Sequence, residues 1–163
     1  MGMISKLLSF ARKEVGSVAT VDPGGGFNRS ADHFSAPGDD SYPLPDDYVA
    51  IVETQRTGGV AAVGYLDPKS EQKAEAGEKR IYARDADGVA VVELWLKADS
   101  SAVLSNALGL IELKADGSVN INGVTIDAAG NVDVPSSLKV GSKEVNLHVH
   151  TGVTSGPSST GPF

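Results

Sequence analysis

The residues of this chain best suited to bind a metal are His148 and His150, which flank Val149. In a β-strand, side chains two residues apart point to the same face, so both imidazoles would face one way. One chain offers two nitrogen ligands, too few to hold a metal firmly, whereas three chains around a threefold axis would offer six. A lone pair with this spacing is also typical of two surface histidines, or of half of an adventitious zinc site.

The segment that leads into this pair has a β-rich texture from about residue 98. Short segments alternate there with turns that carry Gly or Asn, and we expect seven of them: 101–104, 109–114, 117–121, 124–127, 131–134, 137–140 and 144–150. Apolar and polar residues alternate inside the segments, so each has one apolar face and is too short to bury it alone. Two turns resemble each other, with Gly117 and Gly130 at equivalent positions, which indicates a winding architecture.

Winding three copies around one axis would turn these apolar faces inward and pair most strand edges with a neighbouring chain. Seven layers at about 4.8 Å per strand would make a shaft of roughly 35 Å. Leu147 and His148 have opposite parity, so the apolar face must switch between them through a twist, a bulge or the end of the shaft.

Residues 15–97 predict a small β-barrel. Strands are expected at 15–21, 48–54, 59–66, 79–84 and 89–97, with a long loop over 22–47 that is rich in Gly, Pro and Asp. Asp87-Gly88 between the last two strands is a tight hairpin signal. Five strands without room for large helices favour an OB-fold barrel, and a β-sandwich is the alternative.

Residues 1–14 form a separate N-terminal segment. Met3, Ile4, Leu7, Leu8 and Ala11 follow the spacing of an apolar helical stripe. We therefore expect a helix over residues 3–14, either as a docking helix for a partner or as a frayed terminus with helical bias.

Composition narrows the class of partner. The chain has 163 residues and a formal net charge of −7, from 21 acidic and 14 basic residues. This balance argues against a nucleic-acid partner, which needs a basic patch, and against adhesion to anionic lipid. The absence of cysteine excludes disulfides and thiolate metal sites. No apolar run approaches the length of a membrane span, and no signal peptide is expected.

Other chemistry-bearing residues carry weaker signals. No G-x-S-x-G motif appears, and no carboxylate pair has the apolar setting of a glycosidase, so we do not expect an enzyme. Asp39-Asp40 and Asp46-Asp47 lack the spacing of a calcium loop. His33 is expected to be a solvated loop residue. Trp95 is expected to cap the barrel or to lie at a subunit contact.

The chain resembles the baseplate central spike proteins of contractile-tailed phages, a group also called baseplate assembly protein V-like and related to R-type pyocin and type VI secretion spikes. Residues 16–66 are similar to the family's OB-fold domain, and the stretch after Val153 departs from its pattern. The more specific resemblance, over 76–163, is carried by Gly77-Glu78-Lys79-Arg80-Ile81-Tyr82, the Asp87-Gly88 hairpin, the short repeats, and His148-Val149-His150-Thr151-Gly152-Val153 with Thr160-Gly161-Pro162.

The resemblance implies an all-β homotrimer with an OB-fold collar (15–97), an intertwined triple-stranded β-helix shaft (98–147) and a metal-bound tip (148–163). His148 and His150 of three chains would bind one iron ion per trimer through six nitrogens. Six imidazoles favour octahedral geometry, which suits divalent iron, cobalt or nickel better than zinc, so the choice of iron rests on the resemblance.

The implied function is a membrane-piercing spike at the tip of the tail baseplate of the virion. Its partners would be two further copies of the chain, a baseplate hub protein above, onto which residues 1–14 would dock, and transiently the host outer membrane. The alternatives are a trimeric receptor- or carbohydrate-binding tail fibre or tip module, and the spike of an R-type bacteriocin or type VI-like injection machine. Against a binding module, the sequence has no aromatic residue between Trp95 and Phe163.

Overall fold

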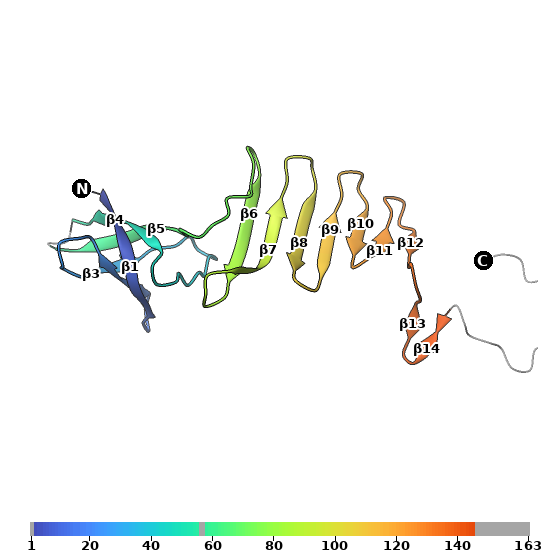
Figure 1. Cartoon of the computed structure of the whole chain (residues 1–163), viewed down its shortest axis with the longest axis horizontal. Helices are drawn as coiled ribbons and strands as arrows, with labels where there is room; N and C mark the ends of the chain where they lie inside the picture. The colour runs from blue at the N-terminus through green and yellow to red at the C-terminus, as the bar shows by residue number, and fades with distance from the viewer. Residues whose placement is uncertain (1, 56–57, 146–163) are drawn as a thin grey trace, which may run out of the picture. The chain divides into compact units, whose positions relative to one another are not determined.

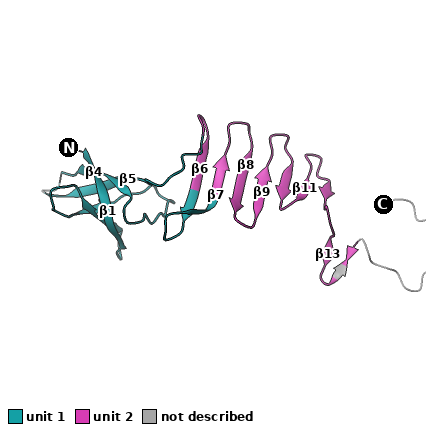
Figure 2. Cartoon of the chain, in the orientation of Figure 1, with its two compact units in different colours: residues 1–74, 82–92 teal, residues 75–81, 93–163 magenta. Residues whose placement is uncertain are grey.

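The computed structural model describes residues 2–55 and 58–145, and this part of the chain holds strands and no helix. The prediction of an all-β protein is confirmed for these residues. The chain divides into two compact units: residues 1–74 with 82–92, and residues 75–81 with the chain from Glu93 onward (Figure 2).

The first unit contains a closed five-stranded barrel. Its strands are β1 (Gly2–Arg12), β2 (Ser17–Asp22), β3 (Arg29–His33), β4 (Tyr48–Glu53) and β5 (Val60–Leu66) (Figure 1). They follow the order β1-β2-β3-β5-β4, with β3 and β5 parallel and the other neighbouring strands antiparallel. β1 closes the barrel because its first half pairs with β4 and its second half with β2. The structure therefore confirms an OB-like barrel, rather than a sandwich, in the first half of the chain.

The barrel interior is a packed aliphatic core. Its largest fully buried side chains are Leu7, Val21, Val49 and Ile51. Small residues such as Ala19, Ala31 and Ala62 complete the core. Every buried apolar residue of the described chain lies between Leu7 and Ala62, so this core belongs to the barrel alone.

The helix predicted over residues 3–14 is wrong, because these residues form strand β1. Ser5, Leu7 and Phe10 are buried in the barrel, whereas Ile4 is 75% exposed. The β1–β2 register shifts between Leu7 and Ser9, so the inward spacing changes from two residues to three. A bulged strand with that spacing imitates the apolar period of a helix.

Two of the five strands predicted for the barrel belong elsewhere. β6 (Lys79–Arg84) and β7 (Ala90–Leu96) are strands, as expected, but they pair within a second sheet. Their places in the barrel are taken by β1 and by β3, which interrupts the loop predicted over 22–47. β3 is hard to recognise because it is short and only Ala31 of its residues is buried.

The second sheet is an antiparallel meander of seven strands in chain order. After β6 and β7 come β8 (Ala102–Asn106), β9 (Leu110–Leu113), β10 (Val119–Ile121), β11 (Val124–Ile126) and β12 (Val132–Asp133) (Figure 1). A separate hairpin of β13 (Lys139–Val140) and β14 (Lys143–Glu144) follows. The predicted segments from 101 to 134 match β8–β12, and most of the segment predicted at 144–150 lies outside the described residues.

Candidate functional site

The predicted metal ligands, His148 and His150, lie outside the described residues. Within residues 2–55 and 58–145, no group of three or more His, Cys, Asp or Glu side chains could hold a metal ion. The metal site therefore stays a prediction from the sequence.

The remaining histidine, His33, is not the solvated loop residue that was predicted. It ends strand β3 and is partly buried, with its Nδ1 3.0 Å from the hydroxyl of Tyr65. Its ring packs edge-on against the Phe10 ring, with the two ring centroids 5.2 Å apart. Burial raises the pKa of Tyr65 to about 12, so the phenol stays protonated and able to donate. His33 is a packing residue of the barrel.

Strand register places most aliphatic residues of β8–β11 on one face, and only Val103 and Leu110 of these strands lie on the other. Leu104 pairs with Ile111, Ile111 with Ile121, and Ile121 with Val124 across four successive strands. The intervening positions of the same strands, such as Ser105, Glu112 and Asn120, lie on the opposite face. We call the first set the aliphatic face; on β8–β11 it comprises Ala102, Leu104, Ile111, Leu113, Val119, Ile121, Val124 and Ile126.

The aliphatic face extends onto β7. A hydrogen bond from the Lys97 N–H to the Ser101 carbonyl closes the β7–β8 hairpin, which sets Leu96 beside Ala102. Leu94 lies two residues before Leu96 on the same strand, so its side chain is on the same face.

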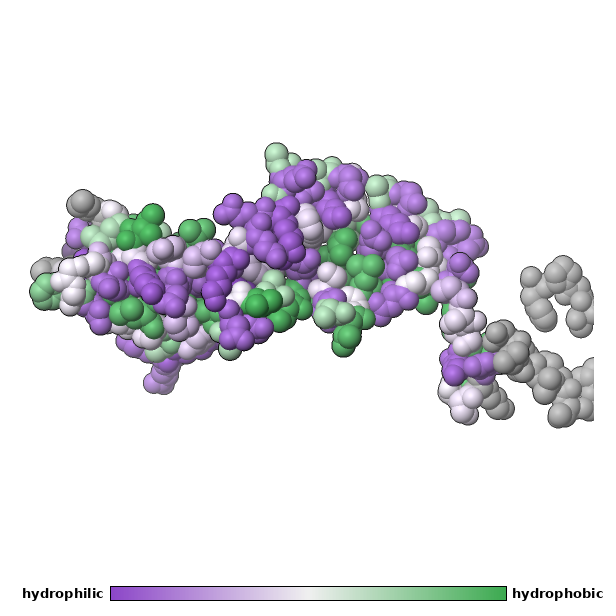
Figure 3. Space-filling view, viewed as in Figure 1, coloured by the Kyte–Doolittle hydropathy of each residue, from purple (hydrophilic) through white to green (hydrophobic). Residues whose placement is uncertain are grey.

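Nothing in the described part of the chain covers the aliphatic face. Leu104 is 44% exposed, Ile111 46% and Leu113 47%. Hydrophobic side chains reach the surface over the sheet in Figure 3. A sheet needs a second layer on its apolar face to be stable, and a contiguous apolar surface marks a site of association. The aliphatic face is therefore the strongest candidate for an interaction surface.

The opposite face of the sheet carries a polar cluster near its first strands. Arg80 of β6 pairs with Glu93 of β7, with side chains 6% and 23% exposed. The indole N–H of Trp95 donates to Glu78 at 2.8 Å, and the Lys97 ammonium lies 5.1 Å from the centre of the indole ring. Trp95 is thus held on the polar side of the second unit. Neither a position that caps the barrel nor a subunit contact is tested for Trp95.

Four hairpins of the meander use one five-residue turn: 85–89, 97–101, 114–118 and 127–131. In each, the first residue's N–H donates to the fifth residue's carbonyl at 2.9 Å. The fourth residue has a positive φ, at Gly88, Ser100, Gly117 and Gly130. Left-handed backbone at this position suits glycine, so Ser100 is the exception.

Aspartates complete these turns in two ways. Asp99 accepts hydrogen bonds from the backbone and hydroxyl of Ser101, and Asp116 does the same with Ser118. These bonds lower the pKa of both aspartates. In the outer turns, Asp85 and Asp127 instead cap from the first position.

Sequence reasoning missed a repeat that these turns make visible. Residues 96–101 read Leu-Lys-Ala-Asp-Ser-Ser, and residues 113–118 read Leu-Lys-Ala-Asp-Gly-Ser. The interval from Leu96 to Leu113 equals two strands and two turns, so it returns the chain to the same face. Comparing Lys-Ala-Asp tripeptides would have found it.

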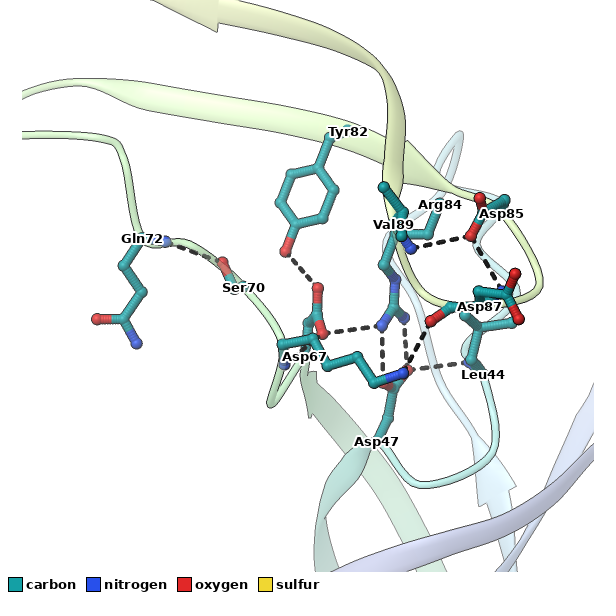
Figure 4. A network of polar contacts seen from close by, with 11 residues as sticks. Leu44, Asp47, Asp67, Ser70, Gln72, Tyr82, Arg84, Asp85, Asp87 and Val89 are labelled. Atoms are coloured by element: carbon teal, nitrogen blue, oxygen red, sulfur yellow. Dashed lines mark hydrogen bonds and ion pairs between the residues drawn. The ribbon is translucent and has the colours of Figure 1, made fainter.

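A polar network ties the β6–β7 hairpin end to the barrel within the first unit (Figure 4). Both terminal nitrogens of Arg84 contact Asp47, at 2.9 and 2.6 Å, and one also lies 3.0 Å from Asp67. The Tyr82 hydroxyl donates to Asp67 at 2.8 Å, and the Lys69 ammonium donates to the Asp87 carbonyl at 2.8 Å. Asp47 is 2% exposed.

Hydrogen bonding and burial have opposite effects on the pKa of Asp67 in this network. Burial alone would raise the pKa of Asp67, but the Tyr82 hydroxyl, the Lys69 N–H and Arg84 lower it below the ordinary value of 3.8. The hydrogen bond to Asp47 raises the pKa of Arg84. Asp67 and Arg84 therefore both carry their charges at neutral pH.

Asp47, Asp67 and Arg84 line a pocket of about 270 Å³ together with Asp46 and Asp87. Four carboxylates around one pocket suggest a cation site, but three of them are paired with basic side chains. Asp47 and Asp67 bind Arg84, and Asp46 binds the Lys6 ammonium at 2.7 Å. The chemistry of the pocket is therefore that of an internal ion cluster.

In the described residues, no helix has the length and apolarity needed to cross a membrane. No protein-family model matches the chain, and no curated protein matches it.

Proposed function

We propose that three copies of this chain pack their aliphatic faces together as an intertwined triple-stranded β-helix, which serves as a membrane-piercing spike. One observation carries the proposal: a single-layer sheet has an aliphatic face on β7–β11 with no cover from the described chain. Completing the burial of one half-exposed aliphatic side chain stabilises by about 1 kcal/mol, so many such side chains supply a strong driving force.

The copy number rests on a separate argument. Two sheets packed face to face would also bury the aliphatic face. Three copies are favoured by the ligand count, because His148 and His150 of three chains would supply six imidazoles around one axis. The strong acid bias, −7 per chain, suits a rod that must stay soluble and free of adhesion to nucleic acid.

The resemblance to baseplate central spike proteins supplies the biological setting of the proposal. Tail contraction would drive the spike through the host outer membrane, and the chain would act mechanically rather than as an enzyme. A baseplate hub protein would hold the barrel end, and the location would be the tip of the virion tail baseplate. An iron ion bound by His148 and His150 would join the three chain ends at the point that meets the membrane.

The deciding experiment is a light-scattering mass of the purified full chain, combined with elemental analysis of the same sample. We expect three times the mass of one chain and one iron per three chains. A mass of two chains would instead indicate two sheets packed face to face as a sandwich, and not a three-sided shaft. A monomer whose sheet stays ordered on dilution would refute the assembly.

The metal is tested separately by replacing His148 and His150 with alanine together. We expect the bound metal to be lost while the trimer persists, because the aliphatic faces hold the shaft together. Less than about one iron per ten trimers in the unmodified protein, purified without chelator, would count against the site.

A further inference from the structure

We propose that Arg84 fastens the end of the β6–β7 hairpin to the barrel, so that the two behave as one body. In the spike, this contact would carry the push from the barrel into the first strands of the sheet. That consequence rests on the proposed function, whereas the fastening does not.

The two carboxylates that receive Arg84 are fixed to the barrel backbone. Asp47 precedes β4, its carboxylate accepts the Leu44 N–H at 2.9 Å, and its carbonyl accepts the N–H of Leu7 in β1 at 2.7 Å. Asp67 follows β5 directly, and its carboxylate accepts the Lys69 N–H at 2.9 Å. Contacts with the barrel backbone therefore hold both carboxylates in place independently of Arg84.

The hairpin end supplies the complementary groups. Tyr82 and Arg84 lie two residues apart on β6, so their side chains share one face and reach the two acids together (Figure 4). The Asp87 carbonyl at the turn accepts from Lys69. Because the guanidinium of Arg84 contacts two carboxylates, it restricts both rotation of the hairpin end and its separation from the barrel, which a single contact would not do.

Burial separates this cluster from ordinary surface ion pairs. The side chains of Arg84, Asp47 and Asp67 are 15%, 3% and 11% exposed. Arg12 and Asp40 form a comparable two-point pair at 2.9 and 3.1 Å, but their side chains are 52% and 76% exposed. Water screens the second pair and competes little for the first.

The covalent link from β5 to β6 offers no substitute for this fastening. Residues 71–77 are exposed along their whole length. An exposed segment of this kind resists extension only when fully stretched, so it cannot hold the hairpin end in place by itself.

The test is hydrogen exchange of backbone amides, measured by mass spectrometry on the full chain. Arg84→Met should speed exchange in residues 82–92 by about tenfold or more, the factor for each 1.4 kcal/mol of lost coupling. Exchange in β2, β3 and β8–β10 should change less than about twofold. Arg12→Met, the matched exposed pair, should leave 82–92 as in the unmodified protein.

Arg84→Met leaves two buried carboxylates unpaired, which could unfold the barrel as a whole. A second variant therefore combines Arg84→Met with Asp47→Asn and Asp67→Asn, so that no unpaired charge remains. Faster exchange confined to 82–92 in this variant supports the fastening. Unmodified protection of 82–92 in either variant, or equal acceleration across both units, overturns it.

The mass of each sample distinguishes this inference from the proposed function. If the protein is not a trimer, the proposed spike fails, yet the exchange comparison between Arg84→Met and Arg12→Met is still valid. If the trimer forms and 82–92 stays protected without Arg84, only the fastening fails.

Discussion

The barrel and the seven-stranded sheet use similar aliphatic residues and bury them differently. In the barrel, Leu7 and Val49 are fully buried by strands of the same chain. In the sheet, Leu104 and Ile111 pair across neighbouring strands on the aliphatic face and stay almost half exposed. A closed barrel supplies its own second layer, whereas an open meander does not. The barrel therefore completes its core within one chain, whereas the aliphatic face of the sheet would be covered only in the assembly that we propose.

This comparison can be followed spectroscopically. The four tyrosines, Tyr42, Tyr48, Tyr65 and Tyr82, lie in the first unit, and the single tryptophan, Trp95, lies in the second. Tyrosine signals therefore report on the barrel unit and tryptophan fluorescence on the sheet.

The largest effect is expected from a charge on the aliphatic face. Leu104→Asp should abolish assembly, because three carboxylates would be buried together in an apolar interior. Ser105→Asp is the matched control, since Ser105 points to the opposite face of the same strand. Light scattering checks both variants. Equal loss of assembly in both would show that the aliphatic face is not the contact.

A core truncation should damage the barrel without any dependence on concentration. Leu7→Ala removes a fully buried side chain and should destabilise the barrel by about 2–5 kcal/mol. Leu8→Ala, at a neighbouring exposed position, should have little effect. Denaturant unfolding followed by the tyrosine signals measures this. A midpoint that moved with protein concentration would mean that the barrel, too, is completed by other copies.

Acid should weaken the barrel through Asp67. The pKa of Asp67 is lower in the folded chain than its ordinary 3.8, so its stabilising effect is complete well above pH 3.8 and is lost as the pH falls through the folded value. Asp67→Asn should cost about 1.5–3 kcal/mol at pH 7 and should flatten the acid dependence. Asp40→Asn, in the exposed Arg12 pair, is the control. Melting curves at pH 7 and pH 3 measure the loss of stability in acid. An equal loss of stability in Asp67→Asn and in the unmodified chain would contradict the role of Asp67.

The sheet was easier to predict from the sequence than the barrel, for a physical reason. Residues 117–126 alternate in polarity because only one face is apolar, and Asn122-Gly123 has the positive φ values of a tight hairpin. β1 was misread because a bulge changes its period, and β3 because it buries a single side chain. Which strands close the barrel depends on the long-range pairs β1–β4 and β3–β5, which local pattern does not encode, so β6 and β7 were assigned to the barrel.

The polar network shows a similar limit. In the sequence, Asp46-Asp47 is only a pair that lacks the spacing of a calcium loop, and Arg84 is only the end of a predicted strand. Their pairing spans 37 residues and depends on the barrel being closed. The aliphatic face was predictable from alternation, whereas His148 and His150 stay a prediction that the described residues do not test.

A shortened sheet should keep its assembly, because a meander grows by addition of neighbours. Deleting residues 97–113 joins Leu96 to Lys114 and preserves the Leu-Lys-Ala-Asp turn and the parity of both strands. We expect an unchanged number of copies and a shaft shorter by about 9.6 Å, two strand spacings. Deleting 97–112 is the control, since one extra residue moves the following side chains to the wrong face. Small-angle scattering would refute modularity if both deletions dissociated.

The smallest expected effect concerns the turn that lacks glycine. Ser100 has a φ of 73°, where the equivalent Gly117 has 85°. Ser100→Gly relieves left-handed strain worth about 1 kcal/mol but adds freedom to the unfolded chain, so we expect a net gain of about 0.5 kcal/mol. Gly117→Ser, the reciprocal change in the same Leu-Lys-Ala-Asp context, should lose a similar amount. Thermal melting followed by Trp95 fluorescence measures both, and a gain from both or from neither would mean that turn strain does not limit the stability of the sheet.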